Sequence, residues 1–154
     1  MRTARHTAAT LLATAALAAC GMAGPGSSRP SMTSPSASAT TTSMVTELSA
    51  RNEVPPNASP GTGRATMTLN RSTKVLTWNV TYAGLTGPLT GAHIHAAAEG
   101  TNGPVVVPFT VTPSPITGSA TLTDAQVQQL AQGLMYVNLH TAANPGGEIR
   151  GQLK

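Results

Sequence analysis

Cysteine, aromatic residues and charged residues are all scarce in this chain of 154 residues. It has one cysteine, and 3% of its residues are aromatic and 9% are charged. A single cysteine excludes an intramolecular disulfide bond. The basic residues are scattered, with few aromatic residues between them, so the sequence lacks the basic surface typical of nucleic-acid binding. We therefore expect no nucleic-acid partner.

Motifs of common enzyme classes are also missing. The sequence has neither the Gly-x-Ser-x-Gly motif of serine hydrolases nor a glycine loop of the kind that binds phosphate. Its five acidic residues are too widely spaced to indicate a catalytic carboxylate pair. These absences favour a binding protein over an enzyme.

The first 19 residues are typical of an export signal. Two arginines precede an apolar run over residues 8–19, which is shorter than the about 20 residues that a membrane-spanning helix needs. The run ends in a sequence that resembles a bacterial lipobox, which is cut just before its cysteine. Lipid on Cys20 would explain an unpaired cysteine in an exported protein, whereas the alternative is an ordinary secretory signal that happens to end beside it. We predict a lipoprotein signal peptide over residues 1–19 and a lipid-anchored, extracytoplasmic protein of the cell envelope.

The rest of the chain divides into a tether and one domain. Residues 20–43 consist mainly of Ser, Thr, Pro, Gly and Ala, a composition that predicts a disordered spacer. Residues 44–154 have the length of a single domain and contain short segments in which apolar and polar residues alternate. They predict an all-β fold, an antiparallel β-sandwich of the immunoglobulin-like or superoxide-dismutase-like kind. One short helix is expected after Thr123, which forms a capping-box pattern with Gln126.

Three histidines provide the main indication of a functional site. His93 and His95 are two residues apart in one predicted strand, so their side chains share a face. His140 ends a later strand in which the apolar residues alternate with Tyr136, Asn138 and His140 itself. If the two strands are neighbours, the three imidazoles form a cluster on the face turned away from the core.

Such a cluster predicts a metal site. Neutral imidazole binds copper(II) and zinc, three imidazoles leave a further position open, and the Irving–Williams order places copper ahead of zinc. On the same outward faces, Tyr136, Asn138 and Glu148 are expected to hydrogen-bond the imidazoles or to act as weaker ligands. Arg150 is expected either to steer an anion to the site or to pair with Glu148.

Two other functions remain open on the sequence alone. In the first, the histidines form only a polar network with Asn138, Glu148 and Arg150, and the domain is a metal-independent module that presents loops 51–61 and 110–115 to an envelope protein. In the second, the domain is a redox enzyme like Cu/Zn superoxide dismutase, which also presents a His-x-His strand to copper. That reading is disfavoured because the histidines and aspartate of a zinc half-site, and a disulfide, are missing.

Several segments, taken in order, resemble the CHRD domain, which is named after chordin and is common in exported bacterial proteins. The resemblance covers residues 45–154 and implies a β-sandwich in an extracytoplasmic setting, while implying little about activity. The segments that carry it are residues 53–56, 91–95, 103–106, 122–130, 136–141 and 144–152.

Overall fold

The computed structural model describes residues 40–154. The predicted signal peptide, Cys20 and nearly all of the predicted tether lie outside the described residues. Among the residues that are described, no helix is long and apolar enough to cross a membrane.

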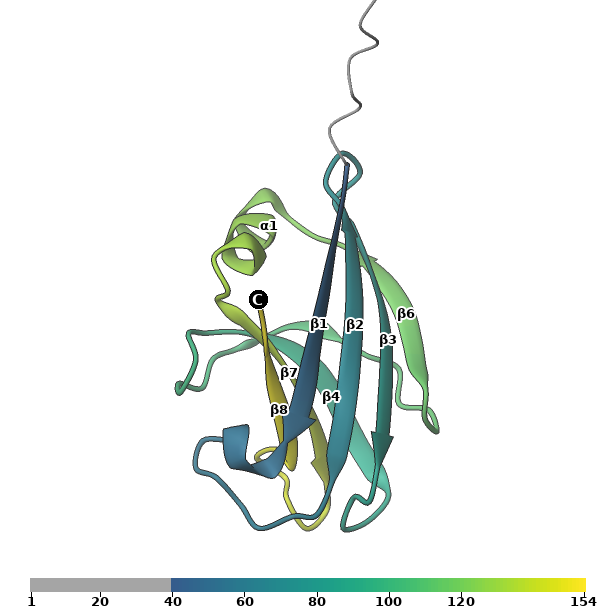
Figure 1. Ribbon diagram of the computed structural model, residues 1–154, viewed down its shortest axis with the longest axis vertical. Coiled ribbons are helices and arrows are strands. Elements are labelled where there is room, and N and C mark those ends of the chain that lie inside the picture. The colour runs from purple at the N-terminus through teal and green to yellow at the C-terminus, as the bar shows by residue number, and fades with distance from the viewer. Residues whose placement is uncertain (1–39) are drawn as a thin grey trace, which may run out of the picture. The chain divides into compact units, whose positions relative to one another are not determined.

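The described part of the chain is built from antiparallel strands and one short α-helix (Figure 1). The expectation of an all-β fold with one short helix is therefore confirmed. The elements are β1 (Thr41–Ser49), a 3-10 turn η1 (Ala50–Asn52), β2 (Thr62–Asn70), β3 (Val75–Ala83), β4 (Leu89–Ala96), β5 (Val105–Pro108), β6 (Ile116–Thr121), α1 (Asp124–Ala131), β7 (Met135–Thr141) and β8 (Ile149–Leu153).

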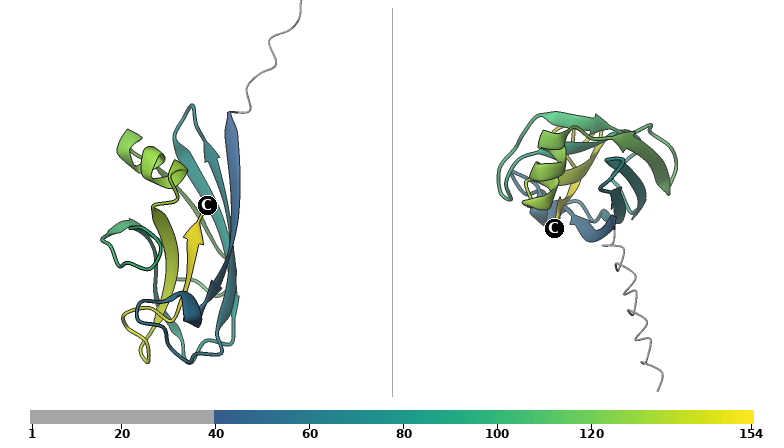
Figure 2. Two further views of the ribbon diagram at one scale, coloured as in Figure 1. Left: turned by 60° about the vertical axis from the view of Figure 1, so that its left-hand side comes forward. Right: turned by 90° about the horizontal axis from the view of Figure 1, so that it is seen from above.

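All eight strands belong to one nearly closed sheet, with the order β5-β4-β7-β8-β1-β2-β3-β6. Its two halves are joined by a single residue pair between β1 and β8, Ser49 with Arg150. The sheet therefore folds over at this joint, and β7 and β8 (green to yellow) face β1 and β2 (blue) in Figure 2. The strands β5 and β6 are the two edges.

The core lies between the two halves and follows the alternation of the sequence. Leu48, Met67 and Leu76 from one half, and Ile94 and Leu139 from the other, are at most 1% exposed. Near the open edges the rings of Trp78 and Phe109 stack with centroids 4.4 Å apart. Each apolar side chain of this size contributes about 1.5–3 kcal/mol on burial, which is the main term that keeps the halves together.

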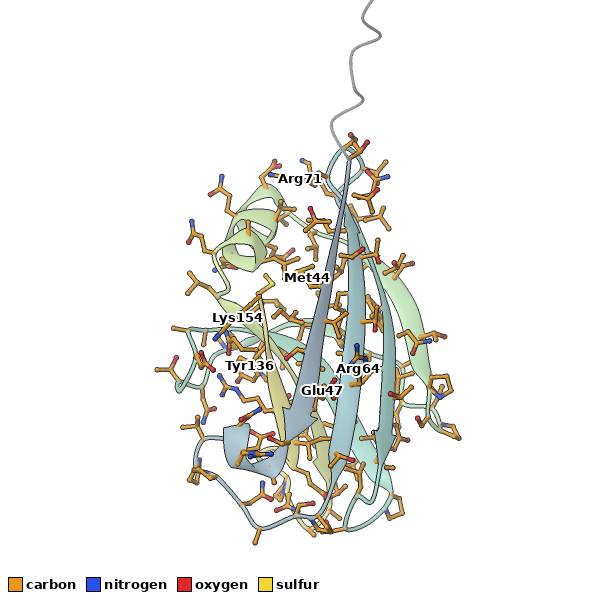
Figure 3. The ribbon with its side chains drawn as sticks, in the orientation of Figure 1. Met44, Glu47, Arg64, Arg71, Tyr136 and Lys154 are labelled. Carbon is orange, nitrogen blue, oxygen red and sulfur yellow. The ribbon has the colours of Figure 1, made fainter. Side chains whose placement is uncertain are left out.

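Polar contacts on the surface add little to this packing. Glu47 of β1 and Arg64 of β2 form an exposed ion pair across neighbouring strands (Figure 3). Exposed pairs of this kind contribute about 0–1 kcal/mol, because solvent screens them.

The predicted capping box is confirmed at the start of α1, whereas the predicted start of the domain needs correction at β1. The hydroxyl of Thr123 accepts from the Gln126 backbone N–H, and the Gln126 side chain accepts from the Thr123 N–H. By contrast, β1 begins at Thr41, three residues before the predicted start of the domain at residue 44. The three residues before Met44 are Thr41, Thr42 and Ser43. Their place in the strand is decided by pairing with the end of β2, which composition does not reveal.

Replacing Gly118 with alanine should destabilise the fold. A Cβ at this position of β6 would lie 2.6 Å from Cζ2 of the buried Trp78 ring, which is itself stacked on Phe109. We expect Gly118→Ala to lower the free energy of unfolding by about 1–3 kcal/mol in urea titrations, because the ring has little room to move. Gly87→Ala is the matched control, since nothing lies within 4 Å of its Cβ position. Equal stability of the two variants would contradict this account of the core.

Candidate metal centre

The histidine strands β4 and β7 are neighbours in the sheet. His95 is paired with Tyr136, His93 with Asn138, and Gly91 with His140. This register brings the three imidazoles together, and one ring nitrogen from each lies within 4.8 Å of the others. The structure therefore assembles the cluster from two segments more than 40 residues apart in the sequence.

Backbone carbonyls fix the orientation of two of the rings. Nδ1 of His95 lies 2.8 Å from the carbonyl oxygen of Gly103, and Nδ1 of His140 lies 3.0 Å from that of Pro145. A carbonyl oxygen only accepts, so both Nδ1 atoms carry the hydrogen and both Nε2 atoms of the neutral rings carry a lone pair. Nε2 of His95 is buried and has no hydrogen-bond partner in the part of the chain described.

His140 makes two further contacts at its Nε2 atom. Nδ1 of His93 lies 3.2 Å away, and the side-chain oxygen of Asn138 lies 2.9 Å away. Because Nε2 is an acceptor in this tautomer, Nδ1 of His93 is the donor in the first contact. The contact with Asn138 places two acceptors together, Nε2 of His140 and the side-chain oxygen of Asn138. It becomes favourable if the Asn138 amide is flipped so that its NH₂ group faces Nε2, or if both atoms bind the same cation.

Burial and mutual repulsion disfavour the charged forms of His93 and His140. The pKa of His93 is lowered from 6.5, first by burial and then by the charges that His140 and His95 would carry. The pKa of His140 is also lowered, mainly by burial, although its hydrogen bond to Pro145 acts in the opposite direction. Neutral rings offer the lone pairs that a metal ion requires, because a proton otherwise competes for the same nitrogen.

The ring of Tyr136 packs against the face of the His95 ring and restrains it. The two rings are stacked, with centroids 4.9 Å apart and planes inclined by 7°. The Tyr136 hydroxyl accepts from the Gly103 N–H at 3.3 Å, so it also touches the residue whose carbonyl orients His95. Tyr136 and Asn138 therefore do contact the histidines, as their shared face indicated.

Arg150 lies behind Tyr136 rather than at the histidines. Its guanidinium carbon is 3.4 Å from the centroid of the Tyr136 ring, and the side chain is 1% exposed. Its Nη atoms donate to the loop between β4 and β5, to the carbonyl of Thr101 at 2.9 Å and to the side-chain oxygen of Asn102 at 3.2 Å. The expected pairing with Glu148 is wrong, because the guanidinium is committed to this loop instead.

Glu148 lies away from the cluster, and its expected contact with the imidazoles is not formed. Its carboxylate accepts from the hydroxyls of Ser59, Thr86 and Thr141 and from the Thr86 N–H. Burial alone would raise its pKa, but these donors outweigh burial and hold the pKa at about 2. The alternation argument failed because β8 begins at Ile149, so Glu148 belongs to the preceding turn and not to the strand.

Two glycines at the site had no predicted role. A Cβ at Gly91 would lie 3.1 Å from Cε1 of His93 and 3.7 Å from Cδ2 of His140, so the glycine leaves room for both rings. A Cβ at residue 103 would overlap the carbonyl of Ala96, so only glycine fits here and places its own carbonyl oxygen at Nδ1 of His95. The sequence signal for Gly91 was its place in the same strand, two residues before His93.

Glu53 is a buried acid that the sequence did not single out as a site residue. It is 4% exposed, and one of its oxygens, Oε1, has no partner among the described residues. Burial raises its pKa from 4.5 to about 7, although the positive charge of Arg150 and a hydrogen bond from the Val54 backbone act against this. Its carboxyl lies over Gly147, where a Cβ would be 2.6 Å from either oxygen.

Comparison with known proteins identifies one family. The family model described as the CHRD domain matches residues 44–153. No curated protein and no solved structure matches the chain.

Replacing Glu53 with glutamine should stabilise the protein at alkaline pH but not at acid pH. Because the folded-state pKa is about 7 and the ordinary value is 4.5, the folded protein binds a proton more tightly than the unfolded chain. Stability is therefore lost as pH rises from about 4.5 to 7, and Glu53→Gln abolishes that loss. We expect urea titrations at about pH 8 to show a gain of about 2–3 kcal/mol, shrinking to near zero at about pH 4.5. The exposed Glu47→Gln is the control, and the prediction fails if the two variants depend on pH in the same way.

Proposed function

The chain belongs to the CHRD domain family, and on that premise we propose that it is an envelope-anchored protein that binds a metal ion through His93, His95 and His140. Copper is the proposed ion, with zinc as the alternative. The observation that carries the proposal is the convergence of three imidazole nitrogens within 4.8 Å, with Nε2 of His95 buried and without a partner.

The direction of the lone pairs supports a metal site more than a polar network. A buried polar atom without a hydrogen bond costs about 1–3 kcal/mol, and a network would be expected to satisfy it. A metal ion would satisfy Nε2 of His95, and it would do so without disturbing the Nδ1 hydrogen bond to Gly103. Backbone carbonyls at Nδ1 are a common way of orienting metal-binding histidines.

The position of the site supports exchange of the ion with the surroundings. His93 and His140 are only partly buried, so an ion can enter and leave from solvent. From Gly91 to Ala96, β4 is paired with β7 without interruption, which limits the ordering cost of binding. Three imidazoles and no thiolate suit copper(II) or zinc, and copper ranks higher in intrinsic affinity. We infer a role in binding or sequestering the metal rather than in catalysis.

A metal-independent interaction module is the second candidate. The loop between β1 and β2, which the sequence suggested as a contact surface, is fixed against the β7–β8 turn. The side chain of Asn57 donates to the carbonyls of Gly147 and Glu148, and that of Asn52 donates to the carbonyl of Arg150. A loop held in this way can present a defined surface to a protein partner in the envelope.

The metal proposal predicts one-to-one binding that depends on all three histidines. Calorimetric titration of the purified protein with copper(II), and separately with zinc, should show a single site. His95→Ala and His140→Ala should each weaken binding by at least about 100-fold, because each removes one of three ligands. Gln128→Ala on the exposed helix is the control and should bind as the parent does. Unchanged affinity in the His93→Ala/His95→Ala double variant would refute the site and leave the interaction module as the working function.

The anchoring proposal predicts that Cys20 carries lipid and holds the protein at the membrane. Two acyl chains give stable attachment, because each buried CH₂ contributes about 0.8 kcal/mol. Cys20→Ser should therefore move the protein from the detergent phase to the aqueous phase in phase partitioning. Mass spectrometry of the parent protein should show an acylated residue 20 at its N-terminus. An unmodified Cys20 in the exported protein would show that the segment is an ordinary secretory signal.

A further inference from the structure

A polar cleft lies beside the histidine cluster but is built from other residues. It has a volume of about 420 Å³ and opens between η1 and the loop that joins β4 to β5. Glu53 and Arg150 line it, with Gln152 beside them and Glu99 at its rim. The hydrogen bond from the Asn102 side chain to the carbonyl of Val54, at 2.7 Å, fastens its two walls together.

The cleft brings together a buried acid and a buried base that do not pair. Glu53 is 4% exposed and Arg150 is 1% exposed. Burial of opposite charges is favourable only when they are well paired and hydrogen-bonded. Yet the ion pairs of the described residues are Glu47 with Arg64, Asp124 with Lys74, and Glu99 with Lys154, so Glu53 and Arg150 are further apart than an ion pair allows.

Both groups retain unused hydrogen-bonding capacity. Oε1 of Glu53 has no partner among the described residues. The guanidinium of Arg150 has five N–H bonds, while its contacts within the described chain involve only Nη1, toward Asn102, and Nη2, toward Ala98, Thr101 and Gln152. The Nε–H and one Nη1–H are therefore left over. The cleft presents an acceptor and a donor with a gap between them.

We propose that this cleft binds an amide group, which donates its N–H to Glu53 and accepts from Arg150 through its carbonyl oxygen. The preferred ligand class is a peptide or a small carboxamide. At a pH above about 7, where Glu53 is ionised, an anion would match Arg150 but face the Glu53 carboxylate, and a cation would match Glu53 but face Arg150. A neutral group with a donor beside an acceptor satisfies both and leaves no buried charge without a partner.

The size and placement of the cleft agree with this ligand class. Its volume falls within the range of about 300–1,000 Å³ that is usual for small-molecule sites. Glu53 also begins the segment 53–56, which the sequence analysis singled out and which the metal proposal leaves without a role. The inference uses none of the three histidines, so it stands or falls independently of metal binding.

The test is a titration of the mature protein with N-acetylglycinamide, monitored through the backbone amide chemical shifts in nuclear magnetic resonance spectra. We expect saturable shifts centred on Glu53, Gly100 and Arg150, with a dissociation constant in the millimolar range that suits a fragment of this size. Sodium acetate and methylammonium chloride, which offer only an acceptor or only a cationic donor, should bind more weakly.

Two variants test whether the ligand binds through Glu53 or responds to any change of charge at the cleft. Glu53→Met keeps the volume but removes the acceptor and should weaken binding by at least about fivefold. Glu99→Gln, on the rim of the same cleft, is the matched control and should bind as the parent does. If Glu53→Met does not fold, Glu53→Gln keeps the shape and, measured above about pH 7, replaces the carboxylate by a weaker neutral acceptor, so it should also weaken binding.

The proposal is overturned if N-acetylglycinamide gives no saturable shift, which would mean that the gap holds only water. It is equally overturned if acetate or methylammonium binds as tightly as N-acetylglycinamide. The same holds if Glu53→Met loses no more affinity for N-acetylglycinamide than Glu99→Gln does. Because none of these measurements contains metal, failure here leaves the histidine site untouched, and failure of copper binding leaves this cleft untouched.

Discussion

The buried guanidinium of Arg150 holds the loop between β4 and β5 against the outer surface of β7 and β8. It lies on the Tyr136 ring, with its carbon 3.4 Å from the centroid, and donates to the backbone of the β4–β5 loop. Its own residue pairs with Ser49, the single point at which the two halves of the sheet are joined. A charge buried this deeply is tolerated because carbonyl oxygens, an amide oxygen and an aromatic face replace its water. The outer surface of β7 and β8 thereby becomes a polar layer under a loop.

The histidine cluster depends on this layer. The loop that Arg150 holds contains Gly103, whose carbonyl oxygen accepts from Nδ1 of His95 and thus fixes which nitrogen is free. Tyr136 is enclosed between His95 and Arg150, so its ring cannot turn without disturbing both. The orientation of a surface imidazole is therefore set by a side chain two strands away, through packing and hydrogen bonds rather than direct contact.

The two buried carboxyl groups show how different environments produce different roles. Glu148 has donors from three residues, and its pKa falls to about 2, as suits a permanent charge that ties turns together. Glu53 is buried with little to offset the loss of water around its charge, and its pKa rises to about 7. The first group is satisfied by the fold, whereas the second is not, and an unsatisfied buried acid facing a cleft is where a ligand would gain most.

Local periodicity and side chains a few residues apart were enough to predict the all-β class, the helix with its capping box, and the shared face of His93 and His95. It also carried the family pattern, which the match over residues 44–153 bears out. The folded chain alone reveals that β4 lies beside β7, that Glu148 turns away from the histidines, and that Arg150 binds a loop. Strand order and loop packing arise from contacts between segments distant in the chain, and no local pattern encodes which of them meet.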